Sequence, residues 1–181
     1  MDEVVESLKA PQNPNVVSDG EPALTWAAMY GQQEVVRLLL EAGADTQWRV
    51  YDDEYTALHL AARNGYSEVA RILLEFGADM EAVDSLRSRP LHWASLEGHA
   101  AVTQLLLDAG ADKEAEADCG QRPLHFAANL GRLDVVNLLL EAGVERNALD
   151  WGGMSAAQLA PQSGHPDVAQ LLQGDKRRRL S

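Results

Sequence analysis

Apolar and small residues recur along the chain in blocks that repeat about every 33 residues. Each block contains an Ala-rich stretch, a glycine, a run of Val and Leu, and a second glycine. The Leu residues that mark the Ala-rich stretches stand at positions 24, 58, 91 and 124, so their spacings are 34, 33 and 33 residues. Self-similarity at such a period indicates a chain built from repeated supersecondary units.

Each block predicts two short helices joined by a tight turn and followed by an extended loop. A first glycine (Gly31, Gly65, Gly98 and Gly131) permits the turn between the helices, and a second (Gly43, Gly77, Gly110 and Gly143) permits a left-handed helix end. Pro90 and Pro123 fall near a first helical turn, where a missing N–H costs little. One unit cannot bury its own apolar face, so the units must stack into an all-α solenoid.

The motifs that repeat in frame resemble the ankyrin repeat. They are Gly-Ala-Asp at 43–45, 77–79 and 110–112, and the segments Thr56-Ala-Leu-His59, Arg89-Pro-Leu-His92 and Arg122-Pro-Leu-His125. The resemblance covers residues 17–173 and implies an ankyrin-repeat domain of about five repeats, near 17–50, 51–83, 84–116, 117–149 and 150–173. The fifth copy carries Pro161, which predicts a shortened first helix.

The two ends of the chain depart from the repeat. The segment Glu3-Val4-Val5-Glu6-Ser7-Leu8 resembles residues 34–39, so residues 1–16 are either a partial capping helix with a linker or a disordered start. Residues 174–181 form a basic tail with Lys176, Arg177, Arg178 and Arg179, which is either a nuclear-import signal or a solubilising end.

Net charge restricts the partners. The 181 residues carry a formal charge of -13, and the sequence pI is about 4.7. Such a surface repels a phosphate backbone, so we expect no nucleic-acid binding and a protein partner with a basic surface. No apolar segment is long enough for a membrane span, and Cys119 is the single cysteine. These features predict a monomer in the cytoplasm, the nucleus or both.

The residues that could carry chemistry have simpler explanations. His59, His92 and His125 occupy one position in successive units, so they cannot converge on a single zinc ion. The resemblance implies instead that each bonds to nearby backbone. Cys119 has no histidine partner at an informative spacing, and the glycines follow the repeat and form no phosphate-binding loop. We therefore expect no enzyme activity, no metal and no cofactor.

The aromatic residues fall into two groups. Trp26, Trp93 and Phe126 share one position of the first helix and are predicted to pack in the core. Trp48 and Trp151 fall in loops between repeats, where exposed aromatic side chains favour partner binding.

The resemblance also implies a concave partner-binding face made of loop tips and the exposed side of the first helices. Transferred position by position, the predicted contact residues are Met29, Tyr30, Trp48, Arg49, Tyr51, Asp52, Asp53, Tyr55, Arg63, Asn64, Leu86, Arg87, Leu96, Glu97 and Trp151. Tyr, Trp, Arg and Met are enriched at interfaces, and they are densest in the N-terminal half, where we expect the main contact.

The sequence thus predicts a non-catalytic protein–protein interaction module that acts as an adaptor, a scaffold or a stoichiometric inhibitor. Two alternatives stay open. One is an ankyrin-type inhibitor of a cyclin-dependent kinase, although that family shortens the first helix of its second repeat and residues 56–64 here predict a full one. The other is a structural segment of a longer repeat protein.

Overall fold

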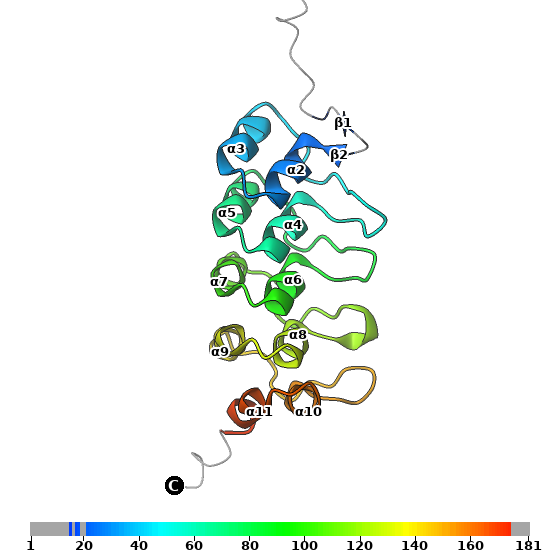
Figure 1. Ribbon diagram of the computed structural model, residues 1–181, viewed down its shortest axis with the longest axis vertical. Helices are drawn as coiled ribbons and strands as arrows, with labels where there is room; N and C mark the ends of the chain where they lie inside the picture. The colour runs from blue at the N-terminus through cyan, green and yellow to red at the C-terminus, as the bar shows by residue number, and fades with distance from the viewer. Residues whose placement is uncertain (1–14, 16, 19–20, 175–181) are drawn as a thin grey trace, which may run out of the picture.

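A computed structural model describes residue 15, residues 17–18 and residues 21–174. Within this part, five helix pairs stack in one direction, and the first helices form one column while the second helices form the other (Figure 1). The pairs are α2 (Ala23–Met29) with α3 (Gln33–Glu41), α4 (Ala57–Asn64) with α5 (Ser67–Glu75), α6 (Pro90–Glu97) with α7 (Ala100–Asp108), α8 (Pro123–Asn129) with α9 (Leu133–Glu141), and α10 (Ala156–Gln162) with α11 (Pro166–Gln173). The predicted repeat solenoid is confirmed.

Extended loops leave the column of first helices and project to one side (Figure 1). The short strands β1 (Val17–Ser18) and β2 (Glu21–Pro22) pair antiparallel before α2. Isolated bridges join Val50 to Tyr55 and Leu149 to Ser155 in later loops, and a 3-10 turn, η1 (Asp118–Gly120), lies in another. The tips of the four loops between helix pairs are hereafter the first tip (51–55), second tip (84–88), third tip (117–121) and fourth tip (150–154).

Small side chains allow the first helices to approach one another closely. Ala28, Ala61, Ala94 and Ala127 are fully buried where α2, α4, α6 and α8 pack in sequence. The Val and Leu runs of the second helices supply the larger core residues, with Val102, Leu106 and Leu139 completely buried. Each helix pair therefore buries its apolar face only against its neighbours in the stack, which is the packing of a solenoid.

Three buried histidines connect each repeat to the loop that follows it. The Nδ1 atom of His92 accepts a hydrogen bond from the backbone N–H of Arg89 at 3.0 Å, which caps the start of α6. Its Nε2–H then donates to the carbonyl of Ala115 at 2.9 Å in the next loop. His59 and His125 make the same pair of contacts, to the carbonyls of Ser88 and Ala148. The structural role that the resemblance implied is present.

A second contact between repeats packs a ring on a glycine. Gly65 has a φ of +78°, and a Cβ atom added there would lie 2.5 Å from Nδ1 of His99. The His99 imidazole also donates from Nε2 to the carbonyl of Arg63 at 3.0 Å. Gly65 thus has two roles, because it adopts a left-handed conformation and leaves room for the next repeat.

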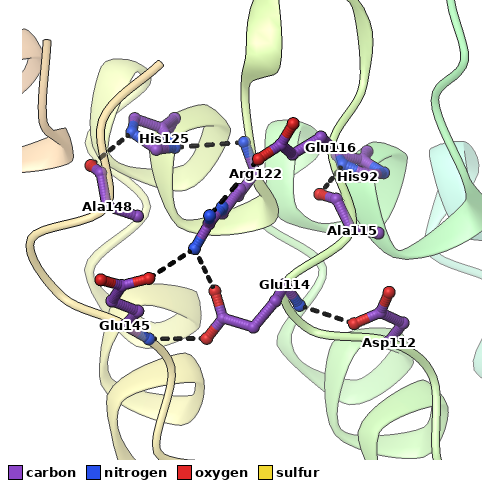
Figure 2. Close-up of polar contacts among 9 residues, drawn as sticks. All are labelled: His92, Asp112, Glu114, Ala115, Glu116, Arg122, His125, Glu145 and Ala148. Carbon is purple, nitrogen blue, oxygen red and sulfur yellow. Dashed lines mark hydrogen bonds and ion pairs between the residues drawn. The ribbon is translucent and has the colours of Figure 1, made fainter. Parts of the chain in front are cut away.

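Arginines at the starts of two first helices form ionic clusters, and each cluster joins one loop to the next. Arg122 contacts Glu114 at 2.9 Å, Glu116 at 3.3 Å and Glu145 at 2.9 Å, and Figure 2 shows the guanidinium among these carboxylates. The other oxygen of Glu114 accepts the backbone N–H of Glu145. Arg89 makes the equivalent contacts to Glu81 and Asp112. The clusters lie at the middle of the stack, since Thr56 and Ser155 stand at the corresponding positions of the second and fifth repeats.

Two sequence predictions are wrong. Trp26 was expected in the core, but its side chain is 47% exposed and stacks on Tyr30, which is itself 54% exposed. The first helix of the fifth repeat was expected to be short, but α10 has seven residues, as α8 has, and it continues through Pro161 to Gln162. Pro161 has no N–H to bond to the carbonyl of Ala157, so α10 forms with one such backbone bond fewer. The predicted capping helix at 3–8 and the basic run at 176–179 lie outside the described residues.

The ionic cluster predicts a specific stability difference. Arg122→Ala leaves three carboxylates without their shared cation in a site where the arginine side chain is only 20% exposed. We expect the free energy of unfolding to fall by about 1–3 kcal/mol. Arg71→Ala is the matched control, since its pair with Glu68 is more than half exposed and is worth less than about 0.5 kcal/mol. Urea unfolding of the two variants tests this, and equal losses would contradict it.

Candidate protein-interaction surface

The four loop tips and the adjoining side of the first helices form one surface, hereafter the loop face. Backbone hydrogen bonds join each tip to the next. Ser85 N–H donates to the carbonyl of Asp53 at 3.0 Å, Asp118 N–H to that of Leu86 at 3.0 Å, and Trp151 N–H to that of Cys119 at 2.9 Å. The tips therefore form a connected row, so their side chains are held in fixed relative positions.

The second tip is organised by a buried carboxylate. Oδ1 of Asp84 accepts the backbone N–H groups of Leu86 at 2.9 Å and Ser88 at 2.7 Å. Oδ2 accepts the indole N–H of Trp93 at 2.9 Å. The carboxylate thus fixes both the turn and the orientation of the Trp93 ring. Asp84 is only 4% exposed, so it supports the tip from inside.

An apolar groove lies between the second and third tips. It has a volume of about 380 Å³, and its walls are Leu86, Ser88, His92, Trp93, Leu96, Ala117, Asp118, Cys119, Gln121 and Phe126. The predicted contact residues Leu86 and Leu96 therefore come together here. Trp93 and Phe126, which the sequence placed in the core, are only partly buried and also line the groove.

Arg63 lies beside this groove and rests on aromatic rings. Its guanidinium carbon is 4.9 Å from the Trp93 ring centroid and 5.7 Å from that of Tyr55. Both distances are typical of cation–π contacts. The side chain keeps its charge at the surface, where an acidic or carbonyl group of a partner can reach it.

Tyr55 was predicted to contact a partner, and this prediction is wrong. The residue is 6% exposed, because it packs with Val50 and Leu60 and its ring meets the edge of Trp93 at 5.5 Å. Burial raises the pKa of its hydroxyl, and the nearby carboxylate of Asp53 raises it further. Tyr55 thus supports the loop face from beneath. A residue two places before an Ala-rich helix gives no sequence signal that distinguishes this position from an exposed tip.

A cluster of aromatic side chains and one methionine forms on the first repeat. Trp26 and Tyr30 stack with ring centroids 4.9 Å apart, and both are about half exposed. The hydroxyl of Tyr51 approaches the sulfur of Met29 at 3.7 Å. The structure therefore brings together three residues predicted from sequence and adds Trp26, which the sequence analysis missed. The spacing of four residues between Trp26 and Tyr30 was the available signal, since it places both rings on one side of the helix.

The other predicted residues have varied surroundings. Arg49 pairs with Glu54 at 3.3 Å and donates to the carbonyl of Val83, and the Asn64 amide donates to the carbonyl of Leu60 at 2.8 Å. Trp151 is 66% exposed, yet its indole ring lies against Gly120. Exposed or partly exposed positions are also found for Trp48, Asp52, Asp53, Arg87 and Glu97.

Four tip residues other than glycine adopt the left-handed conformation that favours glycine, namely Tyr51, Glu54, Arg87 and Cys119. Gly120 and Gly153 occupy equivalent tip positions with φ of +71° and +75°, while Glu54 and Arg87 occupy the same position in earlier repeats with φ of +59° and +56°. A side chain in this left-handed region costs roughly 1–2 kcal/mol relative to the ordinary helical region. Such strain is often found at functional surfaces.

The buried histidines are neutral. Desolvation lowers the pKa of His92 to about 4, and it also lowers the pKa values of His59 and His125. The hydrogen bonds that these histidines make to loop carbonyls raise their pKa values, but by less than desolvation lowers them.

Within the described residues, no three His, Cys, Asp or Glu side chains gather as a metal site. No helix in that part of the chain is both long and apolar enough to cross a bilayer.

Comparison with known families identifies the class of protein. The family model for ankyrin repeats (3 copies) matches residues 1–84, 47–117 and 91–179. The chain therefore belongs to the ankyrin-repeat family, whose members generally mediate protein–protein interactions and are generally non-catalytic. The comparison with curated proteins found no match.

The strained second tip yields a stability prediction. Arg87→Gly relieves the positive φ, and the gain exceeds the added entropy of the unfolded chain, so we expect stability to rise by up to about 1 kcal/mol. Arg87→Ala removes the same side chain but retains the strain, so it should give no increase. Thermal unfolding of both variants separates these effects. An equal rise in both would assign the gain to loss of the arginine charge.

The histidines predict how stability depends on pH. Because the pKa of His92 falls from 6.5 to about 4 on folding, protons bind the unfolded chain preferentially between these values. Stability is therefore highest above pH 6.5 and declines as the pH falls towards 4, by up to about 3 kcal/mol from His92. Urea unfolding at pH 7 and pH 4.5 measures the decline. His92→Gln should be less stable at pH 7 but less pH-dependent, and an unchanged pH dependence would contradict the assignment.

Proposed function

We propose that this protein is a non-catalytic binding module that holds a protein partner on its loop face, as an adaptor, a scaffold or a stoichiometric inhibitor. The observation that carries the proposal is the apolar groove between the second and third tips. It combines partly exposed Trp93 and Phe126 with Leu86, which is 54% exposed, on a scaffold fixed by hydrogen bonds. Large anchors held rigidly are the features that give interfaces most of their binding energy.

The Trp26, Met29, Tyr30 and Tyr51 cluster supports a contact that extends to the first repeat. Met29 packs on the same buried residues as Trp93 and contacts Tyr51, while Trp26 stacks on Tyr30 at the helix position that Trp93 holds in α6. Tyr and Trp are also enriched in binding hot spots. A partner that occupied both regions would cover the N-terminal half of the loop face. Arg63 lies between them and would contact it as well.

Charge supports a partner with a basic surface. Asp52, Asp53 and Glu54 are exposed on the first tip, Asp118 is exposed on the third, and the whole chain carries -13. These charges favour association with a cationic surface and oppose nucleic acid. We further propose a monomer that acts in the cytoplasm or the nucleus.

The alternative of a cyclin-dependent kinase inhibitor has a feature against it. That family shortens the first helix of its second repeat, whereas α4 has eight residues and is as long as α6. The alternative of a structural segment within a longer repeat protein differs from the proposal in its expected binding. It requires no partner on the loop face.

Affinity capture with matched variants tests the proposed function. Immobilised wild type is compared with Met29→Ala/Tyr51→Ala, with Leu86→Glu, which places a charge in the groove, and with Phe76→Ala, an exposed aromatic at the end of α5. We expect partners held by the wild type and by Phe76→Ala to be lost at least about tenfold from the two loop-face variants. Circular dichroism checks that all four fold alike. Equal capture by every variant would exclude the loop face as the binding surface.

A further inference from the structure

The second helix of the first repeat leaves part of its apolar surface uncovered. Val35 is 41% exposed and Leu38 is 64% exposed on α3. The equivalent residues one repeat later, Val69 and Ile72, are 1% and 2% exposed, and α5 packs against α3. In the repeats that follow the first, this surface is covered by the second helix of the preceding repeat. The described residues contain no element that covers it on α3.

A backbone hydrogen bond sets the register of the chain before α2. Asp112 N–H donates to the side chain of Glu81, and Glu145 N–H donates to that of Glu114. Asp45 N–H donates in the same way to Oδ1 of Asn15 at 2.8 Å. Asn15 therefore accepts the bond that Glu81 and Glu114 accept in their loops, although its partner lies 30 residues further along the chain where theirs lie 31. The loop that contains Asn15 thus belongs to a repeat preceding the first.

The same register predicts where the missing second helix lies. Glu81 follows the last residue of α5, Glu75, by six positions, and Glu114 follows the last residue of α7, Asp108, by six positions. Counting six positions back from Asn15 reaches Lys9. A helix that ends at Lys9 would include the segment 3–8, which shares its initial Glu-Val-Val and its final Leu with residues 34–39.

We propose that residues 3–9 form the second helix of the repeat that precedes α2, and that this helix packs on α3 over Val35 and Leu38. In a helix, Leu8 shares one face with Val4 and Val5, because it follows Val4 by four residues and Val5 by three. The connecting residues 10–14 span up to about 18 Å, which exceeds the roughly 8–10 Å between packed helices. The ankyrin family match also begins at residue 1.

Hydrogen–deuterium exchange on the full chain tests both sides of this contact. Leu8→Lys places a charge on the apolar face of residues 3–9, and we expect amide exchange in α3 to accelerate at least about tenfold. Leu38→Lys adds a cation four positions after Glu34, which favours α3 itself. It should nevertheless accelerate exchange in residues 3–9 by a similar factor. Exchange in α8 and α9 should not change in either variant.

Ser7→Lys is the matched control, because it makes the same charge change beside the apolar face and should leave α3 protected. The proposal is overturned if residues 3–9 of the wild type exchange as fast as an unstructured peptide. It is also overturned if Ser7→Lys acts like Leu8→Lys. A third contrary outcome is protection of α3 that rises with protein concentration while residues 3–9 stay unprotected, since a second copy of the chain would then be the occupant.

Discussion

Each buried histidine places one imidazole between two repeats, and the rest of the stack depends on this contact. The Nδ1 atom caps its own helix, while the Nε2–H of His92 reaches the carbonyl of Ala115 in the next loop. The ring must be neutral to do both, which burial ensures by lowering its pKa. These two bonds fix the position of the following loop relative to the helix that carries the histidine. Ala-rich first helices can then approach closely, and the Val and Leu runs close the core behind them.

The binding surface is a consequence of the same spacing. Because the loops are held at a constant separation, the carbonyl of one tip meets the N–H of the next, as with Leu86 and Asp118. These backbone bonds restrict the motion of the tips, so the residues that line the groove are held in place. A partner therefore need not order the surface when it binds, which lowers the entropic cost of association. The positive φ of Arg87 fits this interpretation, since the neighbouring tips stabilise a conformation that the residue alone would avoid.

The periodic features of this fold were predictable from sequence, and the features that depend on neighbours were not. Spacing alone located the helix pairs, the glycine turns and the histidines. It could not distinguish Tyr55, which is buried beneath Trp93, from Tyr51, which is exposed four residues earlier. It also assigned Trp26 and Trp93 the same environment because they share a helix position. Their surroundings differ, because the Trp93 indole N–H is held by Asp84 and its ring meets Tyr55, whereas the Trp26 ring stacks on the exposed Tyr30.

Ionic contacts between loops are unevenly distributed along the described stack, and this bears on how binding and folding are coupled. The arginine clusters join the loops around Arg89 and Arg122, while Thr56 and Ser155 provide no such cation nearer the ends. In a solenoid, each repeat depends on its immediate neighbours, and Pro22 gives the first repeat no arginine at the corresponding helix start. That repeat also carries Met29, Tyr30 and Tyr51. A partner that bridged this cluster and the central groove would join the first repeat to the repeats that hold the ionic clusters, and its binding energy would add directly to the stability of the N-terminal repeats.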